Sequence, residues 1–232
     1  MSYNGWMKYL YLLAHPDDEV VASGGTIRKL VNNGDQVRVV LATKGQAGKG
    51  ANKRIEEFKK SCEILGVSDY KLLGYQDGEI NNKLVWGRLE QDFIDEINSY
   101  KPEAVVTFDH SGWYFHLDHV GVSLAGVRAV DKAKHKVEVV LFSLFQPPGI
   151  KSRWKYVYAD KLPVTHRVDI EDVLEVKMKA VMAHKSQKIT FLPYLALGKL
   201  HKKYFDHEYF QVALASKRGR KMLEGSDIFR EI

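Results

Sequence analysis

Short apolar runs alternate with stretches of helical periodicity through the first 145 residues of the chain. The runs at 9–14, 37–43, 70–75, 104–108 and 137–145 have the length and apolar content of buried strands. Between them, apolar residues recur at threes and fours in 19–33, 51–65, 85–100 and 119–133, which predicts helices. Strand alternating with helix is typical of βαβ units. The sequence therefore predicts an α/β fold whose mainly parallel sheet is covered by helices on both faces.

The pattern changes after residue 147. Shorter apolar runs at 154–159 and 165–170 precede a helical pattern at 170–186 and an aromatic, histidine-containing tail. With 232 residues, of which 45% are hydrophobic, the chain is long enough to build one sizeable core. We therefore expect a single domain, 1–232, in which a core at 1–147 is covered by a C-terminal extension at 148–232.

Composition limits which metal ligands and which partners the chain can have. Cys62 is the only cysteine, so any metal must be held by histidine and carboxylate side chains. The N-terminal stretch does not resemble a signal sequence, and no apolar run approaches the ~20 residues of a membrane helix, so we expect a cytoplasmic protein without a membrane span. The net charge of +6 is spread over segments that also carry acids. We expect the basic cluster at 216–221 to be solvated surface and no nucleic acid to be a partner.

A dense polar group, HPDDE at 15–19, follows directly after the first apolar run. In open α/β sheets, ligands bind at the carboxyl ends of strands. One interpretation is that Asp17 and Asp18 cap the next helix and favour its positive end. A cap needs only one acid, however, and here three acids stand beside a histidine. His15 and Asp18 are three residues apart across a tight turn, so both side chains can face one metal ion.

A second polar group follows the apolar run at 104–108. Within HSGWYFHLDHVGVS, residues 110–123, His116 and His119 are separated by two residues, and Asp118 is one of them. Taken alone, two histidines at a helix start are more often surface or capping groups than metal ligands. Because the predicted fold brings the ends of these strands to one edge of the sheet, the two groups together predict a metal centre there.

AHPDDE at 14–19 together with HLDH at 116–119 resembles the paired signature of the LmbE/PIG-L family of zinc-dependent N-deacetylases, which act on N-acetylglucosamine-containing substrates. Other segments are similar to family motifs in the expected order: ATKGQAG at 42–48, RIEEFKKSCEILG at 54–66, LGYQDG at 73–78 and HKSQ at 184–187. The resemblance covers about 15–187. It implies a Rossmann-like sheet with the metal site at the carboxyl ends of the strands.

The resemblance implies one zinc ion per chain, held by His15, Asp18 and His119, with water completing the site. Three protein ligands and one open position are how a catalytic zinc site is built. Other divalent transition metals accept two imidazoles and a carboxylate as well, so the native metal stays open.

The same resemblance implies catalytic roles for three further residues. Asp17 would be the general base toward the zinc-bound water, because amide hydrolysis at neutral pH needs a strong nucleophile. His116 would stabilise the tetrahedral oxyanion or protonate the leaving amine, and Asp118 would orient His116 and hold its charge.

Three further residues each have two possible interpretations. Tyr114 matches a position near the substrate carbonyl in some family members, and the alternative is an ordinary loop aromatic. Arg54 is a candidate for sugar hydroxyls or a phosphate, and the alternative is an ion pair with Glu57 or Glu79. His184 is expected to orient the groups around the site or to pack in the C-terminal helix, since three ligands are already assigned.

We therefore expect a zinc-dependent hydrolase that removes the N-acetyl group from a small GlcNAc-type amino sugar or glycoconjugate; a homo-oligomer is compatible with the sequence. One alternative is an amidase of a thiol or another acylated amino-sugar conjugate that uses the same centre. Another is a non-catalytic metal- or sugar-binding protein, but Asp17 and His116 would not be needed there. A nucleotide-binding module fits poorly, because the glycine-rich loop at 45–52 has its lysine before the last glycine.

Overall fold

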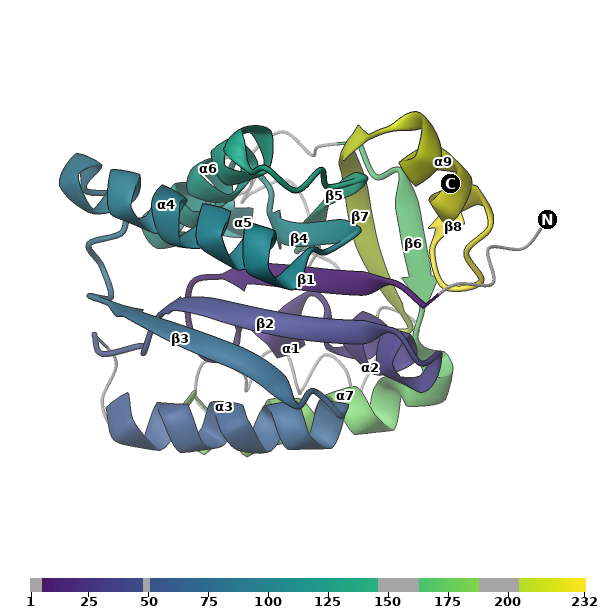
Figure 1. Cartoon of the computed structure of the whole chain (residues 1–232). Helices are drawn as coiled ribbons and strands as arrows, with labels where there is room; N and C mark the ends of the chain where they lie inside the picture. The colour runs from purple at the N-terminus through teal and green to yellow at the C-terminus, as the bar shows by residue number, and fades with distance from the viewer. Residues whose placement is uncertain (1–5, 48–50, 146–162, 188–204) are drawn as a thin grey trace.

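The computed structural model describes residues 6–47, 51–145, 163–187 and 205–232. Within these ranges the strands form one eight-stranded sheet in the order β3-β2-β1-β4-β5-β7-β6-β8 (Figure 1). The first five in that order pair in parallel. They are β1 Lys8–Leu13, β2 Gln36–Thr43, β3 Asp69–Tyr75, β4 Ala104–Phe108 and β5 Val139–Leu144. The predicted α/β fold with a mainly parallel sheet is confirmed.

Helices cover both faces of this sheet, as predicted (Figure 1). On one face lie α1 Asp18–Val21, α2 Gly24–Asn32, α3 Ala51–Leu65 and α7 Leu174–Ala183. On the other face lie α4 Lys83–Tyr100, the short α5 Gly112–Phe115 and α6 Leu117–Lys132. Helix α4 packs against α6, and α3 packs against α7. No helix in the described ranges is long and apolar enough to cross a membrane.

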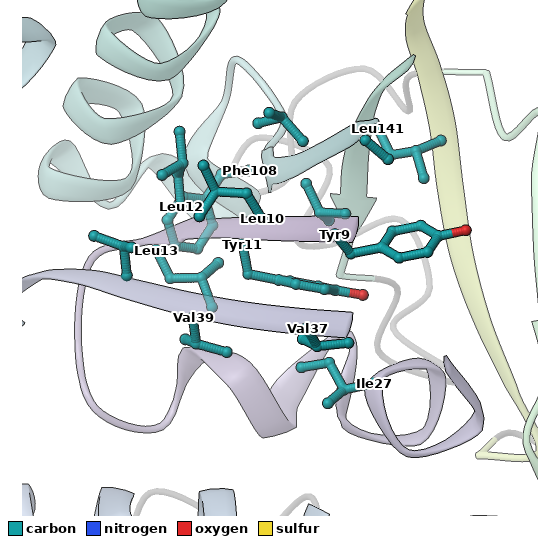
Figure 2. Close-up of a cluster of buried hydrophobic side chains, with 14 of the residues drawn as sticks. Tyr9, Leu10, Tyr11, Leu12, Leu13, Ile27, Val37, Val39, Phe108 and Leu141 are labelled. Atoms are coloured by element: carbon teal, nitrogen blue, oxygen red, sulfur yellow. The ribbon is translucent and has the colours of Figure 1, made fainter. Parts of the chain in front are cut away.

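Strand β1 lies at the centre of the core (Figure 2). Its side chains alternate between the two faces of the sheet, as the twofold repeat of a strand requires. Leu10 and Leu12 are fully buried toward one helical layer, and Tyr11 is fully buried on the opposite face, where Ile27 of α2 also lies. Each such buried side chain contributes about 1.5–3 kcal/mol to folding. The apolar run that predicts the strand is therefore the part of the chain that holds the two layers together.

The helix predicted at 19–33 is two helices, α1 and α2, which are interrupted at residues 22 and 23. The physical reason is a carboxylate from another part of the chain. Glu208 accepts hydrogen bonds from the backbone N–H groups of Gly25 at 2.9 Å and Thr26 at 2.7 Å. These N–H groups belong to the first turn of α2, and Glu208 satisfies them in place of the N-cap residue Ser23, whose side chain makes no capping hydrogen bond.

The C-terminal part extends the sheet with three antiparallel pairings. β7 His207–Ala215 pairs with β5 on one side and with β6 His166–Asp169 on the other, and β8 Arg230–Glu231 pairs with β6. β6 falls in the run predicted at 165–170, whereas the run at 154–159 lies outside the described residues. β7 is not foreseen by the sequence, which suggests only an aromatic tail there. The basic cluster at 216–221 lies mostly in α9, Lys217–Glu224.

Candidate metal and catalytic centre

The two polar groups lie at the ends of neighbouring strands. β1 pairs directly with β4, so the turn at 14–17 and the loop at 109–116 meet at the carboxyl edge of the sheet. Helices α1 and α2, which follow β1, cover one face, whereas α6, which follows β4, covers the other (Figure 1). Such a change of face opens a crevice between two strand ends, which is where open α/β sheets bind ligands.

Three side chains at this edge point toward one spot. His15 Nδ1 lies 3.3 Å from His119 Nε2, and His119 Nε2 lies 3.3 Å from Asp18 Oδ1. The remaining pair, His15 Nδ1 and Asp18 Oδ2, is 3.6 Å apart. Ligands about 2.0–2.1 Å from a tetrahedral metal are separated from one another by about 3.3–3.4 Å. The two imidazole nitrogens have this spacing, whereas Asp18 approaches His119 with Oδ1 and His15 with Oδ2. His116 belongs to the same cluster, because His15, His116 and His119 each offer one nitrogen within 4.8 Å of the others.

Asp18 is held in place by its own turn. Its Oδ2 accepts hydrogen bonds from the backbone N–H groups of Ala14 at 3.1 Å and His15 at 2.7 Å. Burial raises the pKa of this carboxyl, but the imidazoles of His119 and His15 outweigh burial and hold the pKa well below its usual range. Asp18 is thus a preorganised anion beside the two imidazoles.

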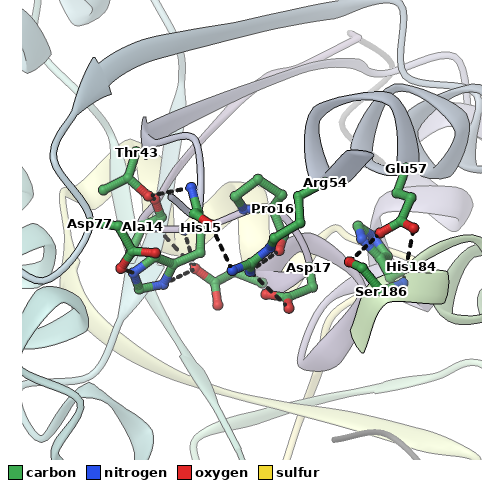
Figure 3. Close-up of polar contacts among 12 residues, drawn as sticks. Ala14, His15, Pro16, Asp17, Thr43, Arg54, Glu57, Asp77, His184 and Ser186 are labelled. Atoms are coloured by element: carbon green, nitrogen blue, oxygen red, sulfur yellow. Dashed lines mark hydrogen bonds and ion pairs between the residues drawn. The ribbon is translucent and has the colours of Figure 1, made fainter. Parts of the chain in front are cut away.

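The second nitrogen of His15 faces two more carboxylates. His15 Nε2 lies 3.1 Å from Asp77 Oδ1 and 3.1 Å from Asp118 Oδ2 (Figure 3 shows Asp77 beside the ring). Asp118 also accepts hydrogen bonds from the backbone N–H groups of Gly78 at 2.7 Å and Ile80 at 3.1 Å. Burial lowers the pKa of His15, but hydrogen bonds to Asp118, Asp18 and Asp77 outweigh burial and raise it well above its usual value. The acceptors at Nε2 favour a proton on that nitrogen, so a metal would replace the proton on Nδ1.

These contacts change the expected role of Asp118 and add Asp77. The resemblance implies that Asp118 orients His116, but the hydrogen bonds of Asp118 go to His15 and to the backbone. Asp77 has no role in the sequence analysis, although it stands in LGYQDG, one of the quoted motifs. The sequence feature that could have identified Asp77 as a site residue is its position just after β3. Because β3 is two strands away from β1 in the sheet, strand ends alone did not bring Asp77 to the site.

His116 lies against both candidate imidazole ligands. Its ring centroid is 4.8 Å from that of His15, and it stacks on His119 at 4.4 Å. Burial lowers the pKa of His116, and the imidazoles of His119 and His15 lower it further. His116 Nδ1 is buried without a hydrogen-bond partner in the described structure. His116 is therefore a neutral imidazole with a nitrogen left over, adjacent to the spot where the three ligands converge.

Asp17 precedes the candidate ligand Asp18 in the chain, and its carboxylate forms an ion pair with Arg54. Its Oδ2 lies 3.2 Å from Nη2 of Arg54 (Figure 3). Arg54 Nη2 also donates to Pro16 O, and Nη1 donates to Gly45 O. Burial raises the pKa of Asp17 to about 7, and the charge of Asp18 acts in the same direction, whereas Arg54 opposes both. A carboxylate with this pKa is suited to accept a proton near neutral pH. The ion-pair partner of Arg54 is thus Asp17, where Glu57 or Glu79 was the alternative considered.

The loop that carries Tyr114 has strained backbone. Trp113 and Phe115 have φ angles of 67° and 64°, in the left-handed region that bulky residues rarely adopt. Trp113 is anchored in the core, where its Nε1 donates to Ser143 O at 2.9 Å. Tyr114 is 40% exposed, and its ring centroid lies 5.7 Å from that of His119. The loop therefore places an accessible phenol beside the candidate ligands.

His184 lies outside the ligand group. Its Nε2 is 2.7 Å from Oε1 of Glu19, and both side chains are fully buried. The expectation that His184 acts on the surroundings of the site rather than on a metal is compatible with this contact.

Comparisons with known proteins agree with the fold and the motifs. The profile of the PIG-L family, described as GlcNAc-PI de-N-acetylase, matches residues 10–130. The chain is 32% identical to diacetylchitobiose deacetylase of Thermococcus kodakarensis, over 80% of this chain and 72% of that protein. It is 27% identical to the 1D-myo-inositol 2-acetamido-2-deoxy-alpha-D-glucopyranoside deacetylase of a Mycobacterium species, over 78% of this chain and 74% of that protein.

Among solved structures, N,N'-diacetylchitobiose deacetylase from Pyrococcus horikoshii superposes with a TM-score of 0.70 at 22% identity, covering 91% of this chain and 85% of that one. The family profile spans more than half of the chain and includes both polar groups from which the centre is built. The chain belongs to the PIG-L family.

Proposed function

We propose that the protein is a zinc-dependent N-deacetylase that removes the acetyl group from a GlcNAc-type amino sugar or glycoconjugate. The observation that carries this proposal is that His15 Nδ1 and His119 Nε2 lie 3.3 Å apart, with Asp18 Oδ1 at 3.3 Å from His119 Nε2 and Asp18 Oδ2 at 3.6 Å from His15 Nδ1. Two imidazoles and one carboxylate leave one position of a tetrahedral ion open, as a catalytic site requires. The donor set therefore fits zinc, although iron or cobalt would accept it too.

A bound zinc ion would supply a Lewis acid that polarises the amide carbonyl and makes water a better nucleophile at neutral pH. The chain itself supplies the proton transfers. Asp17, whose pKa is raised to about 7 by burial and by Asp18, takes up the proton that water loses as its oxygen bonds to the carbonyl carbon. When the C–N bond breaks, that proton returns to the amine nitrogen, directly from Asp17 or through His116, so the products are acetate and the free amine. His116, which is neutral because burial and neighbouring imidazoles lower its pKa, supplies hydrogen-bond donation to the developing oxyanion. Such a donor is typically worth about 3–4 kcal/mol in the barrier.

The substrate class rests on the relatives. The two relatives named above act on a chitobiose and on an acetamido-deoxyglucoside, so both deacetylate an N-acetylated hexosamine. Tyr114 lies beside the candidate ligands and is accessible, so we assign it to contact with the substrate. Arg54 contributes by holding Asp17, because its guanidinium is buried against that side chain and two backbone oxygens. The amidase alternative uses the same residues and differs only in the acylated amine that it accepts.

The test is acetate release from a panel of N-acetyl hexosamines, a diacetylated disaccharide and acylated amino-sugar conjugates by protein loaded with one zinc per chain. We expect turnover with a member of the hexosamine group, no turnover after chelation, and recovery when zinc is restored. Asp17→Asn should bind zinc and lose most of its turnover. A protein that binds no divalent metal contradicts the whole proposal, whereas full turnover of zinc-loaded Asp17→Asn contradicts only the role of the base.

A further inference from the structure

Glu19 is a fully buried acid that has no part in the proposed chemistry, yet its carboxylate is completely surrounded by donors. Its Oε2 accepts a hydrogen bond from the backbone N–H of Asp17 at 3.0 Å. Its Oε1 lies 2.7 Å from Ser61 Oγ and 2.7 Å from His184 Nε2. An ionised carboxylate removed from water costs several kcal/mol unless charge and hydrogen bonds compensate it. These three contacts supply that compensation.

His184 is suited to be the charged partner. Its side chain, like that of Glu19, has no exposure to solvent. Burial lowers the pKa of His184, but the charge and hydrogen bond of Glu19 outweigh burial and raise it. The pair is thus a buried hydrogen-bonded contact between the start of α1 and the end of α7, across 165 positions of the chain.

Glu19 accepts a hydrogen bond from a residue with strained backbone, Asp17. Asp17 has a φ of 114° and lies outside the regions that most residues adopt. A backbone of this kind costs about 1–3 kcal/mol and persists only where its surroundings impose it. The bond from Asp17 N–H to Glu19 fixes the peptide on one side of the residue. Arg54 fixes the carboxylate on the other side, with Nη2 at 3.2 Å from Oδ2.

The motif HKSQ at 184–187 connects the C-terminal segment to helix α3. Ser186 donates from its backbone N at 2.9 Å and from Oγ at 2.6 Å to the two carboxylate oxygens of Glu57 on α3 (Figure 3). Ser61 and Arg54, which act on Glu19 and Asp17, stand on the same helix. The C-terminal segment is therefore fastened to α3 at the surface by Ser186, while His184 reaches the interior.

We propose that His184, Ser61 and Glu19 form a positioning clamp that holds the Asp17 backbone in its left-handed conformation and so sets the direction of the catalytic carboxylate. The proposal rests on the role of Asp17 as general base. A clamp of this kind affects the chemical step without contributing a ligand to the metal or a contact to the substrate. A misplacement of the reacting group by about 1 Å can cost roughly 100-fold in rate.

The experiment compares His184→Leu, His184→Gln and Ser186→Ala with the wild type. Leucine removes the donor to Glu19, glutamine restores an N–H donor, and Ser186→Ala breaks the surface fastening but leaves the contact between His184 and Glu19. We expect kcat of His184→Leu to fall roughly 10- to 100-fold with KM and zinc content unchanged. His184→Gln should recover most of kcat, and Ser186→Ala should match the wild type.

Site-resolved amide hydrogen exchange supplies a readout that needs no substrate. The Asp17 amide should exchange faster in His184→Leu than in the wild type and slow again in His184→Gln. If His184→Leu fails to fold, Ser61→Ala is the second variant, and it should lower kcat and speed Asp17 exchange to a smaller extent.

The clamp is wrong if Asp17 exchange and kcat stay unchanged in His184→Leu, or if kcat falls only in parallel with zinc content. A wild-type protein that releases no acetate from any sugar would overturn the proposed function instead. The exchange rates of Asp17 would still report on the clamp, so the two failures are distinguishable.

Discussion

His15 Nδ1 and His119 Nε2 lie 3.3 Å apart, although 104 positions separate the two residues in the chain. The pairing of β1 with β4 brings their strand ends side by side, and Asp18 completes the group from within the same turn as His15. His15 and Asp18 are close in the sequence, but His119 joins them only because β1 pairs with β4, so the three side chains come together only in the folded sheet. This contact is the basis of the first prediction.

His119→Ala should lower zinc affinity by more than the roughly 10- to 100-fold that a supporting residue contributes, because it removes one of the three proposed ligands. The measurement is competition with a chromophoric chelator at constant pH. His207→Ala is the matched control, since His207 is a half-buried histidine whose partner is Asp206 at 2.7 Å. Equal zinc affinities for the two variants would rule out His119 as a ligand.

Asp77→Asn should lower zinc affinity roughly 10- to 100-fold, since residues that orient metal-binding histidines typically contribute this much. The physical reason is the 3.1 Å contact between Asp77 Oδ1 and His15 Nε2, which keeps the Nδ1 lone pair directed at the ion. Glu79→Gln changes net charge equally at an exposed position two residues away and is the control. Zinc titration measures the affinity of both variants. An equal loss of zinc affinity in Glu79→Gln would show that the lost negative charge, and not the contact with His15, explains the effect of Asp77→Asn.

The pH dependence of kcat/KM should follow Asp17, which acts as a base only when deprotonated. Burial, together with Asp18, raises its pKa to about 7, and a bound dication would lower it, so activity should fall as the pH drops through 7 or a lower value. Arg54 lowers this pKa, so Arg54→Met should move the acid limb to higher pH. Arg54→Lys keeps the charge and should move the limb less. A limb that moves to lower pH in Arg54→Met would contradict the assignment.

Gly25→Ala should destabilise the protein by about 1–3 kcal/mol, although alanine is the better helix former. A Cβ at this position would lie 2.7 Å from three side-chain atoms of Ile170, which is closer than carbon atoms approach. At Gly24 the nearest atom is Lys177 Cγ at 3.3 Å, so Gly24→Ala should stay within about 1 kcal/mol of the wild type. Urea unfolding of both variants measures the difference. A Gly25→Ala protein as stable as Gly24→Ala would show that the close packing on Ile170 is wrong.

The sequence by itself determined the repeating part of the fold and the two polar groups of the centre. Apolar periodicity is a local property, so the runs from 9–14 to 137–145 and the helix at 51–65 could be predicted within a few residues. Because parallel strands with covering helices share a carboxyl edge, HPDDE and HLDH could be predicted to lie together. The single long helix at 19–33 was wrong, since the interruption depends on Glu208 from a strand almost two hundred residues away.

Only the tertiary structure decided which carboxylate forms a hydrogen bond with which imidazole. Asp118 contacts His15 rather than His116, Asp77 contacts the same nitrogen from the loop after β3, and Glu19 contacts His184 across the molecule. A buried carboxylate must find donors wherever the packed elements place them, and its own sequence neighbourhood carries no record of those donors. The histidines and acids of the centre can therefore be identified from the sequence. Which carboxylate contacts which imidazole depends on how distant segments pack.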